Sequence, residues 1–221
     1  MSIKLYRSNY DEFDPTKNGG DITDIEIESG VLHSFIPRIR TRTAEAGGER
    51  WFKFFVKTDV DIVSIGIDVA KYTTSPSEEV YFALETKSDH TDYESDLNKD
   101  NIRLYGGFLV KNVDKDNLKI TADRNVSDFV KADDWITFYD SDINRVTSMQ
   151  VDSVDNDTIT FKQWSDKAIF ENYTASSSIL VDSLNANEYI GVWIKQVVGA
   201  YTEAMENPAN EFVFNCWYDI K

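Results

Sequence analysis

β-Branched side chains dominate the apolar residues of this 221-residue chain. Val, Ile and Thr together number 53, whereas Leu and Ala together number 21. β-Branched side chains pack well on a pleated strand and lose rotamer freedom in a helix. The chain is therefore predicted to fold almost entirely into β-strands.

Several segments alternate apolar and polar residues with a period of two, as half-buried strands do. Residues 62–69 and 22–28 alternate in this way, whereas 51–56 and 80–84 are apolar on both faces and predict buried strands. Further strands are predicted at 109–113, 118–121, 135–139, 146–151, 158–161, 179–181, 188–198 and 211–220.

Turns in this chain must rely on Asp and Asn, because only four prolines and ten glycines are present. Residues 152–161 predict a β-hairpin with an Asp-Asn turn. Residues 125–134 predict one short helix capped by Ser127. The polar segment 41–50 predicts a loop or a segment that covers a sheet edge.

Strands of similar pattern lie near both ends of the chain, and shorter strands with tight turns lie between them. This order predicts an all-β fold, an Ig-like antiparallel β-sandwich with an inserted small β-barrel. The sandwich would comprise residues 1–106 and 178–221, and the barrel residues 107–177. In the alternative, the barrel is a second domain that follows the first, and the last three strands belong to it.

The charge of the chain restricts its partners. With 23 basic and 39 acidic residues the net charge is −16, which argues against nucleic acid and against anionic membranes. No apolar run is long enough for a membrane span, and the first residues lack the apolar region of a signal peptide. Together with a single cysteine, this favours synthesis in a reducing cytoplasm.

No catalytic or metal-binding motif emerges from the sequence. Cys216 lies in an apolar strand and is expected to be a core residue, and His33 and His90 are expected to lie in loops. The pairs Asp140/Asp142 and Asp155/Asp157 resemble calcium ligands, but the Gly and distal Glu of an EF-hand loop are missing. The expectation is a protein that is not an enzyme and has no cofactor or metal.

Two groups of residues are candidates for binding. Arg38, Arg40, Arg42 and Arg50 lie close together in an acidic chain and could contact an acidic neighbouring copy, although a solvated loop is an equal interpretation. Trp164 follows the hairpin and could stack on a sugar, with tyrosines such as Tyr93 nearby. Trp135, Trp193 and Trp217 lie within apolar strands and are expected in the core.

A resemblance to a known class of protein adds to this interpretation. The segments Asn18-Gly19-Gly20, Phe35-Ile36-Pro37 and Gly47-Gly48-Glu49-Arg50-Trp51-Phe52-Lys53, with Gly191-Val192-Trp193 near the end, resemble virion structural proteins of tailed bacteriophages. The resemblance spans both ends of the chain and omits the middle block. It implies a non-enzymatic particle protein, and it assigns no functional residue.

The predicted function is therefore a structural protein of a tailed-phage particle, in capsid decoration, neck or tail. Its partners would be other copies of itself and other virion proteins, and it would be located in the virion after synthesis in the host cytoplasm. The alternative is a carbohydrate-binding β-sandwich module, with or without calcium, that recognises a host-surface glycan through Trp164.

Overall fold

The computed structural model describes residues 3–11, 13–28, 41–72, 78–85, 92–181, 183–200 and 212–220, without the side chains of residues 41, 42, 71, 72, 212, 214 and 220. The strands are β1 (Ile3–Arg7), β2 (Gly48–Thr58), β3 (Ile62–Tyr72), β4 (Glu78–Leu84), β5 (Tyr105–Asp114), β6 (Lys119–Ala122), β7 (Trp135–Tyr139), β8 (Arg145–Asp155), β9 (Thr158–Phe161), β10 (Thr174–Ser177), β11 (Ile179–Val181), β12 (Tyr189–Val198) and β13 (Phe212–Ile220). The helices are α1 (Thr41–Ala46) and the 3₁₀-helix η1 (Glu94–Asp96).

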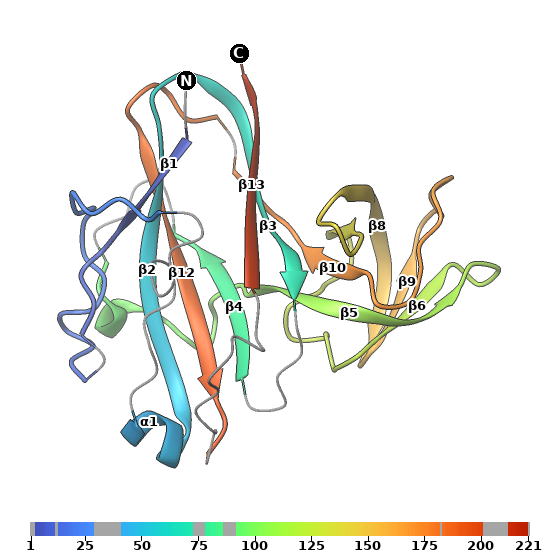
Figure 1. The fold of residues 1–221 in the computed structure, drawn as a ribbon, viewed down its shortest axis with the longest axis horizontal. Helices are drawn as coiled ribbons and strands as arrows, with labels where there is room; N and C mark the ends of the chain where they lie inside the picture. The colour runs from blue at the N-terminus through green and yellow to red at the C-terminus, as the bar shows by residue number, and fades with distance from the viewer. Residues whose placement is uncertain are drawn as a thin grey trace.

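The sandwich is formed by two antiparallel sheets. The large sheet begins with the order β1-β2-β12-β4-β5, and the small sheet has the order β11-β3-β13. The side chains between the sheets are apolar and buried, among them Phe54, Val56, Ile65, Ile67 and Val192. The prediction of an all-β antiparallel sandwich is confirmed (Figure 1).

The middle of the chain forms a closed barrel. β5 pairs with β10 and β6, β10 pairs with β7, β7 with β8, β8 with β9, and β9 with β6, so six antiparallel strands close on themselves. Register shifts occur near Val110 in β5 and near Val151 in β8, where bulges allow a strand to bend. A second core, which includes Phe108, Ile136, Phe138 and Phe161, fills the barrel.

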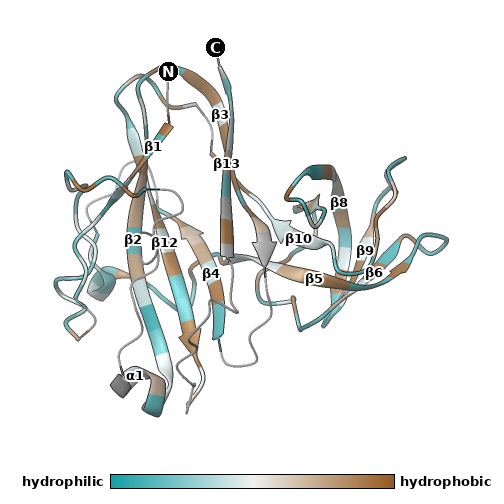
Figure 2. Ribbon diagram, viewed as in Figure 1, coloured by the Kyte–Doolittle hydropathy of each residue, from teal (hydrophilic) through white to brown (hydrophobic). Residues whose placement is uncertain are grey.

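The two parts are joined by continuous structure. β5 pairs with β4 at its start and with barrel strands beyond it. Only Ser178 separates β10 from β11 of the small sheet. Figure 1 shows β5 and β10 side by side at the point where the chain passes between the sandwich and the barrel. In both parts, many strands contain hydrophobic stretches, and many turns are hydrophilic (Figure 2).

Most predicted strands are present, and the hairpin at 152–161 is formed by β8 and β9. β12 lies between β2 and β4 in the large sheet, and β11 and β13 flank β3 in the small sheet. The strands at the end of the chain therefore share sheets with those at its beginning. The domain boundaries at 106/107 and 177/178 stay a prediction.

Three local predictions are wrong. Residues 22–28 form no strand, and only the bridge between Tyr6 and Glu26 is strand-like there. Residues 125–134 form turns instead of a helix, although Val126, Phe129 and Val130 are spaced as on a helix face and are buried in the barrel core. The segment 41–50 comprises helix α1 and the start of β2. Within the described residues no helix is long and apolar enough to span a membrane.

Candidate functional site

The predicted arginine contact is only partly within the described structure. Arg38 and Arg40 lie outside the described residues, and the side chain of Arg42, in α1, is also not described. Arg50 is 5% exposed, and its Nε and Nη2 donate hydrogen bonds of 3.0 and 2.6 Å to the hydroxyl of Tyr10. Its guanidinium therefore joins β2 to the N-terminal segment and is turned into the fold, not toward a partner.

The four tryptophans considered in the sequence analysis differ in their exposure. Trp164 is half-buried against the barrel core, with its ring edge-on to Phe161 at a centroid distance of 6.0 Å. Trp193 is fully buried, as predicted, and Trp217 is half-buried. Trp135 is 46% exposed, so its assignment to the core is wrong. β7 lies in the barrel wall, where Ile136 and Phe138 point inward and Trp135 points outward.

The groups expected to be chemically inactive have structural roles. Cys216 packs against the sandwich core, and burial raises the pKa of its thiol to about 12. The Asp140 carboxylate accepts 2.9 Å hydrogen bonds from the backbone N–H groups of Asp142 and Asn144, which lower its pKa and shape the turn. Among the described residues, no three His, Cys, Asp or Glu side chains gather as metal ligands would. His33 and His90 lie outside the described residues.

A buried carboxylate connects the sandwich to the barrel. Asp68 of β3 is fully buried, and it accepts hydrogen bonds from the Tyr139 hydroxyl at 2.6 Å, Trp217 Nε1 at 3.1 Å, Ser178 Oγ at 3.3 Å and Asn215 Nδ2 at 3.4 Å. Burial raises the pKa of Asp68, and the nearby carboxylate and burial raise the pKa of Tyr139. The network ties β3 and β13 of the small sheet to the barrel strand β7.

Apolar side chains are exposed around this network. Leu180 is 54% exposed and lies opposite Gly66 in the small sheet, while Trp217 lies opposite Gly66 on the other side. A Cβ at Gly66 would overlap the indole of Trp217, so the ring lies directly over this glycine. The guanidinium of Arg145 lies 4.9 Å from the centroid of the Trp217 ring.

Trp135, on the barrel strand β7, is linked to the region of Leu180 by a backbone hydrogen bond. The N–H of Ser178 donates a 3.3 Å hydrogen bond to the carbonyl of Trp135, and Leu180 of β11 follows two residues later in the chain. We name Trp135, Arg145, Leu180 and Trp217 the junction surface. It combines aromatic, aliphatic and cationic side chains from both parts of the molecule.

A second buried polar site lies on the outer face of the large sheet. The ammonium of Lys53 donates hydrogen bonds of 2.8 Å to Glu85 and 2.9 Å to the carbonyl of Asp92, and it lies 5.0 Å from the Trp193 ring. Burial lowers the pKa of Lys53 and raises the pKa of Glu85 to about 7. The site is closed to solvent, so it anchors the segment around Asp92 to the sheet.

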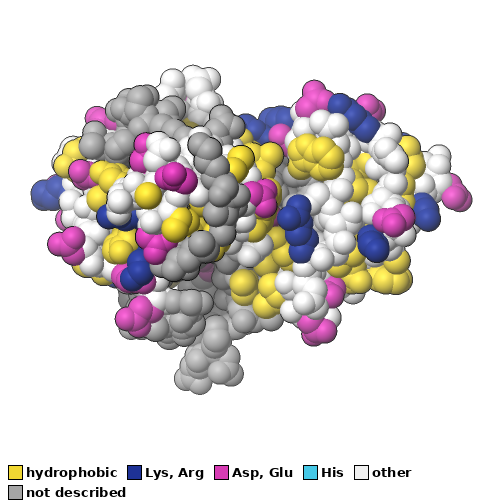
Figure 3. All heavy atoms as spheres, turned by 90° about the horizontal axis from the view of Figure 1, so that it is seen from above, with side chains coloured by type: hydrophobic (Ala, Val, Ile, Leu, Met, Phe, Trp, Pro, Cys, Tyr) yellow, Lys and Arg dark blue, Asp and Glu magenta, His cyan; other side chains and the backbone are white. Residues whose placement is uncertain are grey.

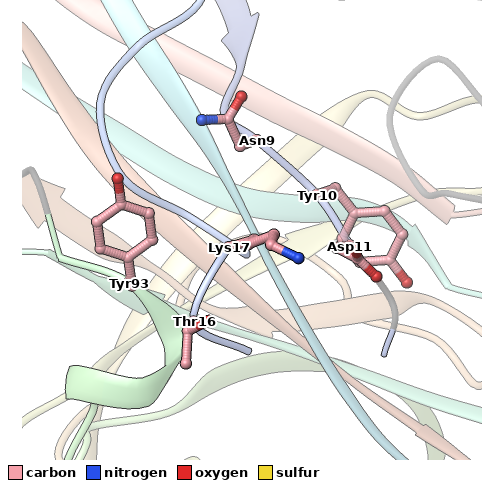
Figure 4. A pocket seen from close by; sticks show the side chains of 6 residues that line it. All are labelled: Asn9, Tyr10, Asp11, Thr16, Lys17 and Tyr93. Atoms are coloured by element: carbon pink, nitrogen blue, oxygen red, sulfur yellow. The ribbon is translucent and has the colours of Figure 1, made fainter. Parts of the chain in front are cut away.

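Above this site, an open groove of about 420 Å³ lies between the N-terminal segment and Tyr93 (Figure 4). Sequence reasoning named Tyr93 and missed the rest of the groove, because its other residues lie about 80 positions earlier in the chain. Asp68 was also missed. Its signal is a lone acidic residue within the apolar run Ile65-Gly66-Ile67-Asp68-Val69.

Comparison of this chain with protein-family models, with curated proteins and with solved structures finds no match.

Proposed function

We propose that this chain is a non-catalytic structural protein of a tailed-phage particle that acts through protein–protein contacts. The observation that carries the proposal is the junction surface, where Trp135 and Leu180 are 46% and 54% exposed beside the half-buried Trp217 and the exposed Arg145. Tryptophan and arginine are the residues most enriched at the energetic centres of protein interfaces.

The surface is held rigidly before any partner arrives. Trp217 is fixed by its hydrogen bond to Asp68 and by its position over Gly66. The backbone of Trp135 is held by its strand pairing with Gln150 of β8. A rigid apolar surface loses little conformational entropy on binding, which favours association with another folded protein.

Two of the segments that resemble virion proteins, 47–53 and 191–193, are neighbours in the fold. Gly191 of β12 pairs with Phe55 of β2, and Trp193 pairs with Lys53. The resemblance in these two segments thus falls on one pair of strands in the large sheet. This pairing supports a shared architecture with particle proteins, and the proposal assigns the chain to the virion after synthesis in the host cytoplasm.

The distribution of charged side chains on the surface is compatible with binding to other proteins. On the face shown in Figure 3, acidic and basic side chains are interspersed with hydrophobic ones, and no extended basic area is present. With a net charge of −16, the chain lacks the electrostatic basis for binding nucleic acid. The proposed partners are other copies of this chain and other virion proteins.

The first test is quantitative mass spectrometry of purified particles, which gives the copies of this chain relative to the major shell protein. Hundreds of copies would indicate a capsid-decoration or tail-tube role, and a dozen or fewer a neck, baseplate or fibre role. Absence from the particle would overturn the proposal.

The second test addresses the contact surface. The double variant Trp135→Ser/Leu180→Ser should lose incorporation into particles or change oligomeric state while its thermal unfolding stays close to that of the wild type. The matched control is Ile25→Ser, because Ile25 is 57% exposed and lies beside β1, outside the junction surface. Equal incorporation of the two variants would exclude the junction surface as the contact.

A further inference from the structure

The open groove beside Tyr93 has the volume of a small-molecule site. Its volume of about 420 Å³ lies within the range of roughly 300–1,000 Å³ that is usual for ligand pockets. Figure 4 shows Tyr93 on one side, Tyr10 and Asp11 on the other, and Lys17 between them. Asn9 and Thr16 complete the lining. The walls are thus two aromatic rings and short polar side chains.

Tyr93 offers an aromatic platform with a firm backing. A Cβ at Gly20 would lie 3.0 Å from Cε1 and Cζ of Tyr93, so the ring rests directly on the glycine backbone. Gly20 has φ of +74°, a conformation that side chains with a Cβ rarely adopt. The tyrosine remains 38% exposed, which leaves part of the ring available to a ligand in the groove.

Hydrogen-bonding groups surround the platform. The side-chain amide of Asn9 is exposed and makes no hydrogen bond to a described residue, so it can both donate and accept. Lys17 forms a 2.6 Å ion pair with Asp14, and the Asp11 carboxylate accepts a 3.0 Å hydrogen bond from the Phe13 N–H. The groove therefore offers both donors and acceptors without a large excess of one charge.

The backbone beneath the groove is fixed to the large sheet. The N–H of Gly19 donates to the carbonyl of Asn9 at 2.8 Å, and the N–H of Gly20 donates to the carbonyl of Asp92 at 2.9 Å. A Cβ at Gly19 would overlap the indole of Trp193, so this turn lies against the buried tryptophan of β12. Both walls of the groove are consequently held in place before a ligand arrives, which favours binding.

From this arrangement we propose that the groove binds a saccharide ring. The C–H face of a pyranose is apolar and stacks on the ring of Tyr93, whereas its hydroxyl groups both donate and accept hydrogen bonds and so match Asn9, Asp11 and Lys17. Lys17 is the single cation among the lining residues and is shared with Asp14, so the groove lacks the cluster of cations that favours a phosphate-rich ligand. The site is separate from Trp164 and from the junction surface.

Saturation-transfer NMR of the purified chain tests the proposal, with the methyl glycosides of glucose, galactose, mannose, rhamnose and N-acetylglucosamine as probes, with and without calcium. At least one probe should bind, and Tyr93→Ala should weaken its binding by about tenfold or more. Tyr93→Trp should retain binding because it keeps the platform. Asn9→Ala, at an exposed position, should weaken binding without affecting the fold.

Trp164→Ala is the matched control, because it removes the other candidate aromatic residue. Unchanged binding in this variant together with weakened binding in Tyr93→Ala would place the saccharide in the groove, whereas loss of binding in Trp164→Ala alone would overturn the proposal. The proposal would also fail if no probe bound the wild type, or if Tyr93→Ala bound as well as the wild type. Particle incorporation of Tyr93→Ala should remain at the wild-type level, so failure here is distinguishable from failure of the proposed function.

Discussion

The ammonium of Lys53 lies 2.8 Å from Oε1 of Glu85, and the two side chains are 0% and 3% exposed. Both belong to the outer face of the large sheet, which the segment around Asp92 covers. Removing two charges from water is costly, and the pair is tolerated because each group has a close partner. The consequences of breaking it can be measured.

Replacement of Lys53 by methionine should destabilise the protein strongly. The variant leaves Glu85 buried without its cation, and loss of one partner of a buried pair typically costs about 3–5 kcal/mol. Urea unfolding followed by tryptophan fluorescence measures this change. Lys4→Met is the control, since the Lys4–Glu26 pair is exposed, and it should unfold almost as the wild type does. Equal effects in the two variants would contradict the assignment.

The same pair should make stability depend on pH. Burial is the main cause that raises the pKa of Glu85 from 4.5 to about 7, against the opposing effect of Lys53. Between these values the folded state binds more protons than the unfolded state, so the contribution is complete below 4.5 and is lost as the pH rises through about 7. Burial lowers the pKa of Lys53 from 10.5, so its contribution to stability is complete above 10.5 and is lost as the pH falls through the lowered value.

Glu85→Gln removes this titration and should flatten the dependence of the unfolding free energy on pH in that window. Chemical denaturation at a series of pH values measures it. Glu26→Gln is the control, because Glu26 is an exposed carboxylate at the surface, and it should keep the wild-type profile. A Glu85→Gln profile that matched the wild type would show that Glu85 does not titrate there.

Asp68→Ala should loosen the connection between the sandwich and the barrel. The variant removes the acceptor of the Tyr139 hydroxyl and of Trp217 Nε1, whereas Asn215 and Ser178 keep bonds to Tyr139 and Thr137, and the expected loss is about 3 kcal/mol. Amide hydrogen exchange should accelerate in β3 and β7. Asp219→Ala, on β13 of the same sheet, removes an exposed carboxylate that accepts one 3.2 Å bond from Ser64 and should change little. Slow exchange retained in both strands would argue against this role.

Gly66→Ala should displace Trp217. The added methyl group occupies the space of the indole, and such overpacking costs about 1–3 kcal/mol. The double variant Gly66→Ala/Trp217→Ala removes the clash, so the two substitutions should not add when unfolding free energies are compared in a double-mutant cycle. Strict additivity would mean that the ring does not lie over Gly66 in solution.

The thiol of Cys216 should react slowly in the folded protein. Burial raises its pKa to about 12, and only the thiolate reacts with disulfide reagents. Titration with a chromogenic disulfide should therefore show one thiol that reacts quickly only after denaturant is added. Rapid reaction in buffer would show that the small sheet opens around β13.

The strands could be predicted because their side chains alternate against a core. In β3, Ile65, Ile67 and Val69 face the sandwich core, as the period of two requires. The same rule failed for residues 22–28, because Ile25 is 57% exposed although Ile27 packs against the core. That segment contacts β1 through a few backbone hydrogen bonds and does not continue the sheet.

The burial of β10 and of Asp68 depends on the contact between the barrel and the sandwich, and the local sequence pattern does not predict that contact. β10 has the sequence Thr-Ala-Ser-Ser and is fully buried, because Ser176 and Ser177 accept hydrogen bonds from backbone N–H groups of Val69 and Gly106. Small hydroxyl residues usually indicate turns, so this strand was missed. For the same reason Asp68 resembles a solvent-facing residue in the sequence, although the barrel covers it.

The single residue between β10 and β11 has a consequence for motion. Ser178 leaves no length of chain that could act as a hinge, and β5 crosses between the same two parts as a continuous strand. The barrel and the sandwich should therefore tumble together, and residual dipolar couplings from both should fit one alignment tensor. A partner would then bind a surface of fixed curvature. The choice of partner would depend on complementary shape, because the barrel and the sandwich could not reorient on binding.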